Sequence, residues 1–211
     1  MGYYPILLDL AQRPCLVIGG GSVAERKVEA LLQAGAAVTV ISPTLTERLD
    51  GWVNEGRVRH ETRRYQKGDL PGYQLAFVAT DDPQVNAAVY EEGREQGVWV
   101  NSADDPVHCD FIVPAVLRRG ELVLAVATGG LSPALSRAIR EELETYFTED
   151  YGTLAEIVGE VRRELRERSS FPSAERWRKA LDGELRRLVA EKRHDEAKNH
   201  LLKRLGADIC A

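Results

Sequence analysis

The stretch 14–27 carries glycines at the spacing G-x-G-x-x-A, which suits the binding of a pyrophosphate. Gly19 permits a tight turn after a short apolar run, Gly21 lets a phosphate approach the backbone, and Ala24 allows a following helix to pack closely. The N-terminus of that helix offers unpaired N–H groups and a partial positive charge. The pattern favours dinucleotide binding over a structural glycine turn, and it assigns the cofactor to Gly19, Gly21, Ser22 and Val23.

The end of the second expected strand lacks the acidic residue that usually binds the ribose hydroxyls. The segment there reads Ile41-Ser42-Pro43-Thr44. Ser42 and Thr44 can each hydrogen-bond a ribose, but neither excludes a 2′-phosphate by charge. Arg48 lies too far along the chain to indicate NADP. The residues alone therefore leave the choice between NAD and NADP open.

A second group of reactive side chains lies in segment 101–111, which reads N-S-A-D-D-P-V-H-C-D-F. An aspartate beyond the carboxyl end of a parallel strand can act as a general base. The carboxylates, His108 and Cys109 also offer oxygen, nitrogen and sulfur ligands to a metal, although their spacing matches no standard zinc pattern. An Asx turn followed by proline is the alternative interpretation and involves no chemistry.

Segment 127–133, A-T-G-G-L-S-P, combines a glycine pair with the start of a helix. Ser132 suits the N-cap and Pro133 the first helical position. The backbone N–H groups here can hold an anion, and a turn before a capped helix explains the pattern equally well. Nearby arginines can bind substrate carboxylates, although a solvated helix face is the commoner explanation. They are Arg118, Arg119, Arg137 and Arg140.

Alternating strands and helices are expected to position these segments. The order of the apolar runs predicts a Rossmann-type doubly wound parallel sheet of the α/β class, with right-handed crossovers. Strands are predicted at 15–18, 36–43, 57–62, 74–82 and 98–101, and helices after the first strand and at 83–96.

Two changes of pattern follow the sheet. Strand-like runs at 111–119 and 121–128 precede the helix that begins near Ser132, and from about residue 151 the pattern is wholly helical. The expected domains are a Rossmann domain (1–113), a small α+β segment (114–150) and a helical C-terminal region (151–211). Within the last, the amphipathic stretches are 154–165, 174–189 and 194–205. We expect this region to serve packing or oligomerisation, with a lid over the active site as the alternative.

The composition limits the class of protein. The 211 residues are 44% hydrophobic and carry a net charge of −5, of which residues 1–150 contribute −8 and the remainder +3. Neither part shows the concentrated basic face of a nucleic-acid-binding protein. No apolar run approaches the roughly 20 residues of a membrane span, and the cysteine spacing favours reduced thiols. We therefore expect a cytoplasmic protein that binds neither nucleic acid nor membranes.

Taken together, these segments resemble the siroheme synthase N-terminal domain family. This family comprises precorrin-2 dehydrogenases, some of which are also sirohydrochlorin ferrochelatases. The matching stretches run in family order over residues 3–145, and their combination is far more specific than the glycine pattern alone. They include PCLVIGGGSVAERK, FVATDDPQVN, VNSADDPVHCDFIVPA and ATGGLSPALSRAIREELE.

The resemblance implies NAD-dependent dehydrogenation of precorrin-2 to sirohydrochlorin in siroheme biosynthesis, a branch of porphyrin biosynthesis, and in some members Fe²⁺ chelation to siroheme. Asp104 stands at the family's catalytic aspartate and is expected to act as a general base. NAD is expected at Ser22 and Val23, with Pro43 and Thr44 as the second family contact and Thr80 at the end of the fourth strand. Substrate contacts are expected at Asn101, Arg118, Thr128, Ser132 and Arg137, and the candidate metal ligands are His108 and Cys109.

The resemblance also implies partners. A homodimer is expected through the segment that follows the Rossmann domain. Bifunctional relatives continue into a methyltransferase domain for which this chain ends too early, so a separate uroporphyrinogen methyltransferase is expected upstream. Thr128 stands where relatives often carry serine, which leaves the role of that hydroxyl open.

Two other functions remain as alternatives. The first is a non-catalytic, NAD-sensing Rossmann regulator whose helical tail binds a partner. The second is another small-molecule dehydrogenase that shares only the cofactor fold.

Overall fold

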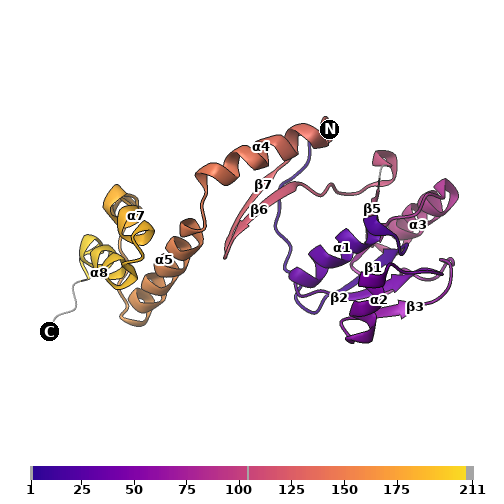
Figure 1. Cartoon of the computed structure of the whole chain (residues 1–211), viewed down its shortest axis with the longest axis horizontal. Helices are drawn as coiled ribbons and strands as arrows, with labels where there is room; N and C mark the ends of the chain where they lie inside the picture. The colour runs from indigo at the N-terminus through magenta and orange to yellow at the C-terminus, as the bar shows by residue number, and fades with distance from the viewer. Residues whose placement is uncertain (1, 104, 208–211) are drawn as a thin grey trace. The chain divides into compact units, whose positions relative to one another are not determined.

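A computed structural model describes residues 2–103 and 105–207 of the chain (Figure 1). The chain folds into two compact units, Met1–Val113 and Pro114–Ala211. Within the described residues, every helix is too short or too polar to serve as a membrane span. The division of the chain into three parts stays a prediction.

The first unit contains a five-stranded parallel sheet in the order β3-β2-β1-β4-β5. The strand order reverses between β1 and β4, which creates the crevice where doubly wound sheets bind ligands. This topology confirms the predicted α/β class. The strands are β1 (Pro14–Ile18), β2 (Ala37–Ile41), β3 (Val58–Glu61), β4 (Leu75–Val78) and β5 (Trp99–Ser102).

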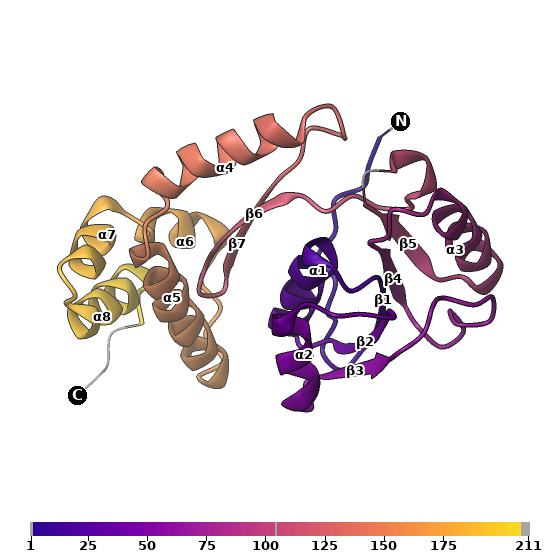
Figure 2. The same cartoon turned by 45° about the vertical axis from the view of Figure 1, so that its right-hand side comes forward.

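Helices cover both faces of this sheet (Figure 2). Cys15 and Val17 of β1 face the core under α1 and α2, whereas Leu16 and Ile18 face the core under α3. Burial on both faces explains why the strands read as continuous apolar runs. The helices are α1 (Ser22–Gln33), α2 (Glu47–Asn54) and α3 (Pro83–Gln96), followed by the one-turn 3₁₀ helix η1 (Pro106–His108).

The second unit begins with an antiparallel hairpin of β6 (Ala115–Arg119) and β7 (Leu122–Val126). Gly120 makes the turn at a φ of 53°, which favours glycine. Helix α4 (Pro133–Tyr146) packs on the hairpin, and its predicted N-cap, Ser132, accepts a hydrogen bond from Leu135 N at 3.1 Å.

Four helices complete the second unit around a buried apolar core that includes Val161, Leu185 and Leu201. They are α5 (Asp150–Glu167), α6 (Ala174–Ala180), α7 (Gly183–Ala190) and α8 (His194–Leu205). The prediction of one helix over 174–189 is wrong, because the chain breaks at Leu181 and Asp182. Asp182 instead caps α7, where Leu185 N donates to its carboxylate at 2.9 Å.

Candidate functional site

The glycine turn after β1 is shaped by close approaches of the backbone. A Cβ on Gly19, whose φ is 118°, would lie 2.2 Å from the carbonyl oxygen of Ala79. A Cβ on Gly20 would lie 1.9 Å from the carbonyl oxygen of Thr44. A Cβ on Gly21 would meet no atom within 4 Å. The first two glycines are therefore required by the protein's own fold, whereas the third leaves open space for a ligand.

The N-terminus of α1 is the end that faces this open space. Its N-cap is Gly21, which offers no side chain to the first N–H groups. The helices α2, α3 and α4 are each capped by a side chain instead, from Thr46, Asp82 and Ser132. The uncapped N–H groups and the helix dipole of α1 suit a phosphate, so this turn fits the pyrophosphate of a dinucleotide.

The loop after β2 braces the glycine turn from outside. Thr46 N donates to the carbonyl oxygen of Gly20 at 3.0 Å, and Thr46 Oγ1 donates to Glu25 Oε2 at 2.7 Å. The Ser42 hydroxyl is buried and donates to the carbonyl oxygen of Thr44 at 2.7 Å. Of the two hydroxyls considered for the ribose, that of Ser42 is turned inward, while Thr44 and the neighbouring Pro43 are exposed.

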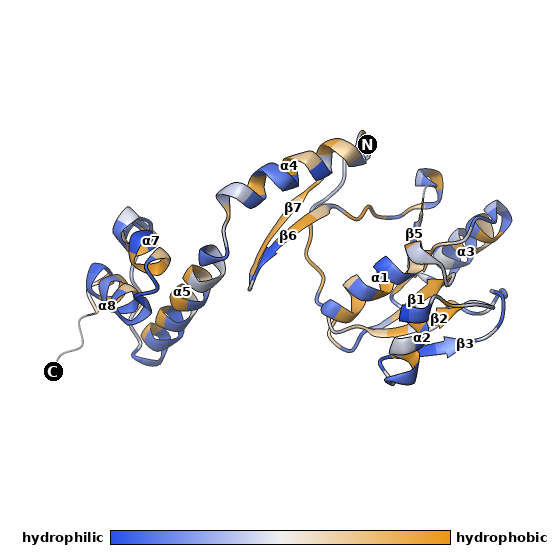
Figure 3. Ribbon diagram, viewed as in Figure 1, coloured by the Kyte–Doolittle hydropathy of each residue, from blue (hydrophilic) through white to orange (hydrophobic). Residues whose placement is uncertain are grey.

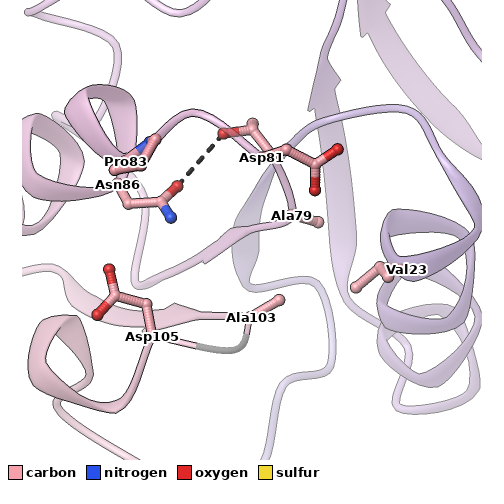
Figure 4. A pocket seen from close by; sticks show the side chains of 8 residues that line it. Val23, Ala79, Asp81, Pro83, Asn86, Ala103 and Asp105 are labelled. Carbon is pink, nitrogen blue, oxygen red and sulfur yellow. Dashed lines mark hydrogen bonds between the residues drawn. The ribbon is translucent and has the colours of Figure 1, made fainter.

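A cavity of about 330 Å³ opens beyond the carboxyl ends of β4 and β5 (Figure 4). Two residues predicted for the cofactor, Val23 of α1 and Thr80 after β4, lie in its wall. The volume falls in the range of small-molecule sites. The other lining residues are Ala79, Asp81, Pro83, Asn86, Ala103 and Asp105.

Three polar side chains of the cavity, those of Thr80, Asn86 and Asp105, form hydrogen bonds within the protein. Thr80 Oγ1 accepts from Asp82 N at 3.3 Å and donates to Asn86 Oδ1 at 3.3 Å. Asp105 Oδ2 accepts from His108 Nδ1 at 2.7 Å, since a carboxylate only accepts. The His108 ring in turn packs edge-on against Tyr90, with centroids 5.4 Å apart. The result is an amide and a carboxylate in fixed places.

Asp104, the predicted general base, lies outside the described residues. Its neighbours in the chain, Ala103 and Asp105, both line the cavity. The segment after η1 returns along β5, where Asp110 N donates to the carbonyl oxygen of Val100 at 2.8 Å. The loop thus leaves the sheet and rejoins it within ten residues.

Asn101, predicted to contact substrate, forms hydrogen bonds within the protein. Its side chain is buried, Nδ2 donates to the carbonyl oxygen of Phe111 at 3.0 Å, and Oδ1 accepts from Lys27 Nζ at 3.3 Å. Lys27 Nζ also lies 5.3 Å from the centroid of the Phe77 ring. These contacts make Asn101 a support of the loop that it begins.

The candidate metal ligands do not converge. Cys109 Sγ accepts from Ser102 N at 3.2 Å, and burial raises the pKa of its thiol although that N–H acts in the opposite direction. His108 bonds to Asp105, as described above. Across residues 2–103 and 105–207, no three His, Cys, Asp or Glu side chains gather as a metal would require.

The remaining substrate candidates all lie in the second unit. Thr128 Oγ1 accepts from Ser132 N at 3.0 Å and lies 3.2 Å from Ser136 Oγ, so that it stabilises the start of α4. The Ser132 hydroxyl serves as the N-cap. Arg118 on β6 and Arg137 on α4 are exposed. Arg119 and Arg140 bond to Phe147 O and to glutamates of α4, respectively.

Two residues that the sequence did not assign to the site, Asn86 and Lys27, have structural evidence for a place in it. Asn86 could have been found from the sequence, because it is a polar residue on the face of α3 that the helical spacing directs toward the core. Val85 and Val89 are its neighbours on that helix. Lys27 belongs to the glycine segment, but its partner Asn101 is far along the chain, and no local pattern reveals that contact.

Comparison with known proteins shows the family to which the chain belongs. Residues 6–115 match a family described as "Putative NAD(P)-binding". The chain is 40% identical over 213 residues to a siroheme synthase of Methylococcus capsulatus, covering 100% of this chain and 44% of that protein. A siroheme synthase of Photobacterium profundum is 40% identical over 204 residues, covering 96% of this chain and 44% of that protein. The chain thus spans less than half the length of these relatives.

Among solved structures, SirC, a precorrin-2 dehydrogenase, superposes with a TM-score of 0.78 and 30% sequence identity. The match covers 95% of this chain and 100% of SirC. With the NAD(P)-binding domain at its N-terminal end, the chain belongs to the family that contains SirC and the matching part of the siroheme synthases.

Proposed function

We propose that this protein is an NAD-dependent precorrin-2 dehydrogenase of siroheme biosynthesis. The observation that carries the proposal is the likeness to SirC over its whole length, together with a dinucleotide turn whose third glycine leaves open space. An oxidoreductase of this kind binds its cofactor and substrate side by side and moves a proton as hydride leaves.

The cofactor is NAD, and when bound it accepts the hydride. The pyrophosphate is held by the glycine turn and the start of α1, at Gly19, Gly21, Ser22 and Val23. The N-terminus of α1 supports this placement because it is uncapped and open. The exposed Pro43 and Thr44 take the adenosine half at the end of β2, and Thr80 lies in the cavity on the opposite side of the crevice.

Asp104 acts as the general base. Its place between two residues that line the cavity supports this role, as does its match to the family's catalytic aspartate. A base is needed because a carbon or nitrogen atom of the substrate loses a proton when hydride leaves. The exposed Arg118 and Arg137, together with Asn101, Thr128 and Ser132, remain the candidates for substrate contacts.

Iron insertion is a second candidate activity, because relatives that match 96–100% of this chain are named siroheme synthases and siroheme contains iron. Fe²⁺ would then be a substrate, and Asp104 would also remove the pyrrole N–H protons. His108 and Cys109 are candidate ligands of the Fe²⁺ ion in this second activity.

The protein functions as a homodimer in this proposal. A two-stranded hairpin is marginal on its own and needs apolar cover. The strands of the β6–β7 hairpin are largely hydrophobic (Figure 3), and Val116 remains 36% exposed. Leu131 and Leu135 at the start of α4 are 89% and 51% exposed. A second copy would bury these side chains, and sedimentation velocity of wild type and a Leu131→Asp, Leu135→Asp variant tests this directly.

The deciding experiment is an anaerobic assay with enzymatically generated precorrin-2 and NAD⁺, which follows NADH and the sirohydrochlorin spectrum before Fe²⁺ is added. NAD-dependent formation of sirohydrochlorin supports the dehydrogenase, and loss of its spectrum faster than in a protein-free control supports the chelatase. Tight NAD binding by folded protein without NADH formation would instead favour the NAD-sensing regulator. The cytoplasmic location and the separate methyltransferase stay predictions.

A further inference from the structure

The cavity beyond β4 and β5 offers two unlike polar groups across a small space. Asn86 is 7% exposed, and its Oδ1 is already used as the acceptor from Thr80 Oγ1 at 3.3 Å. Thr80 Oγ1 also accepts from Asp82 N, which favours this orientation of the Asn86 amide. Its Nδ2 therefore faces the cavity as a donor (Figure 4).

Asp105 supplies the opposite chemistry. Its Oδ2 accepts from His108 Nδ1 at 2.7 Å, and within the described part of the chain no hydrogen bond reaches Oδ1. The Asp105 side chain faces the cavity on the side of Asn86 (Figure 4). A carboxylate is an acceptor only, so the side of the cavity that Asn86 and Asp105 share presents one amide donor and one acceptor.

The position of the cavity shows which part of a dinucleotide can reach it. Val23 of α1 joins the cavity to the glycine turn that fits the pyrophosphate. Since the adenosine half lies toward β2 in doubly wound sheets, the other half extends over β4 and β5. That half ends in a primary carboxamide, which has one carbonyl acceptor and one NH₂ donor.

We propose that Asn86 and Asp105 recognise the carboxamide of the nicotinamide, with Asn86 Nδ2 donating to its oxygen and Asp105 Oδ1 accepting from its NH₂ group. His108 acts as a positioning residue that fixes the Asp105 carboxylate. The inference rests on the proposed function in so far as NAD is the cofactor, and it makes Asp105 a determinant of cofactor specificity rather than of hydride or proton transfer.

The test compares the binding of two dinucleotides by isothermal titration calorimetry, without substrate. Nicotinic acid adenine dinucleotide carries a carboxylate where NAD⁺ carries the carboxamide, so Asp105 should repel it. Wild-type protein is expected to prefer NAD⁺ by tenfold or more. In Asp105→Asn, whose amide can donate to the ligand carboxylate, the preference should fall to within threefold.

A matched control removes a different carboxylate from the same cavity. The oxygens of Asp81 point away from Asn86 and toward Val23 (Figure 4). Asp81→Asn should therefore change the preference by less than twofold. A second variant, Asn86→Leu, keeps the side-chain volume but removes the donor, and it should weaken NAD⁺ several-fold while leaving ADP-ribose, which lacks the nicotinamide, unchanged.

The outcomes separate the two claims. Carboxamide recognition would be overturned if Asp105→Asn kept the wild-type preference for NAD⁺ over nicotinic acid adenine dinucleotide. It would also be overturned if Asp81→Asn changed that preference as much as Asp105→Asn did. In either case NAD binding and the proposed function would stand. Loss of ADP-ribose affinity in Asn86→Leu would likewise count against it, because the variant would then disturb the whole site. Failure of folded wild-type protein to bind NAD⁺ at all would remove the proposed function itself.

Discussion

Lys27 Nζ lies 3.3 Å from Asn101 Oδ1, so the helix that follows the glycine turn is joined to the strand that leads into the acidic loop. Asn101 also contacts the far end of the loop, where its Nδ2 donates to the carbonyl oxygen of Phe111. The turn that fits the cofactor and the loop that carries Asp104 and Asp105 therefore share one support.

Lys27→Met should weaken that support. Hydrogen bonds to charged groups contribute about 1.5–3 kcal/mol, discounted here because Lys27 is only half-buried, so we expect a loss of about 1 kcal/mol in the free energy of unfolding. A double-mutant cycle with Asn101→Ala in urea measures the coupling. An additive result within about 0.3 kcal/mol would show that the two side chains do not stabilise one another. In the activity assay, kcat should fall more than KM rises.

Gly20→Ala is predicted to lower the stability of the fold, whereas Gly21→Ala is predicted to lower the affinity for NAD⁺. The methyl group on Gly20 would collide with the Thr44 backbone, so this variant should lose about 2 kcal/mol or more of stability. The methyl group on Gly21 meets open space, and the change at an N-cap costs about 1 kcal/mol at most. Its NAD affinity should nevertheless drop at least tenfold. Thermal unfolding without ligand and calorimetric titration with NAD⁺ separate the two effects, and equal affinities for Gly21→Ala and wild type would contradict the placement of the phosphates.

Cys15 predicts a pH dependence of stability in the alkaline range. Burial raises the pKa of its thiol from 9.0 to about 11, and its side chain is inaccessible to solvent. As the pH rises, the Cys15 thiol ionises first in the unfolded state, and this ionisation favours unfolding. The contribution of Cys15 to the free energy of unfolding is therefore fully present below about pH 9 and is lost as the pH rises through 11. The shift corresponds to about 2–3 kcal/mol. Urea unfolding at pH 8 to 11 should show this fall in wild type, relative to a Cys15→Ala variant. Parallel pH profiles would show that another group is responsible.

Asp182 makes the corresponding prediction in acid. Burial opposes ionisation. The hydrogen bonds that Asp182 makes with Leu185 N and His200, together with the positive charges of His200 and Arg204, outweigh burial and hold the Asp182 pKa below its ordinary value. Its contribution is present above about pH 4 and is lost as the pH falls through the lowered pKa. Asp182→Ala should cost about 1–2 kcal/mol, mostly from the lost helix cap.

Asp182→Asn is the matched control, because asparagine also caps helices but carries no charge. It should retain most of the stability at pH 7 and lose the acid dependence. If Asp182→Asn were as unstable as Asp182→Ala, the pairing with His200 and Arg204, rather than the cap, would dominate.

The sheet could be predicted from the sequence because its strands are buried on both faces and therefore stand out as apolar runs. Helix α3 and its end at Gly97, which has a φ of 71°, were also legible from local signals. Helix α2 was not, since it is only eight residues long and its cap, Thr46, has no distinctive neighbours. The break at Asp182 was hidden because the apolar spacing continues through it.

Within the site, the glycine turn was predictable because its chemistry is local. Lys27 contacts Asn101 of β5, and Asn86 shares a cavity with Asp105 after β5, and sequence spacing cannot pair residues so far apart in the chain. Glu92 is a further example. It is 2% exposed and accepts from Tyr65 Oη, Gly68 N and Leu70 N at 2.5, 3.0 and 2.9 Å. Its carboxylate thus replaces regular backbone pairing for a loop that has no strand or helix of its own.

The brace between Thr46 N and the carbonyl oxygen of Gly20 bears on how fast and how tightly a ligand binds. A glycine-rich segment has the largest conformational entropy to lose, and ordering it upon association would diminish the affinity. Here folding itself has already restricted the turn, so an arriving pyrophosphate meets a surface in its binding geometry. Thr46 touches no part of the cavity, yet loosening it would slow association by making the binding-competent turn a minority conformation.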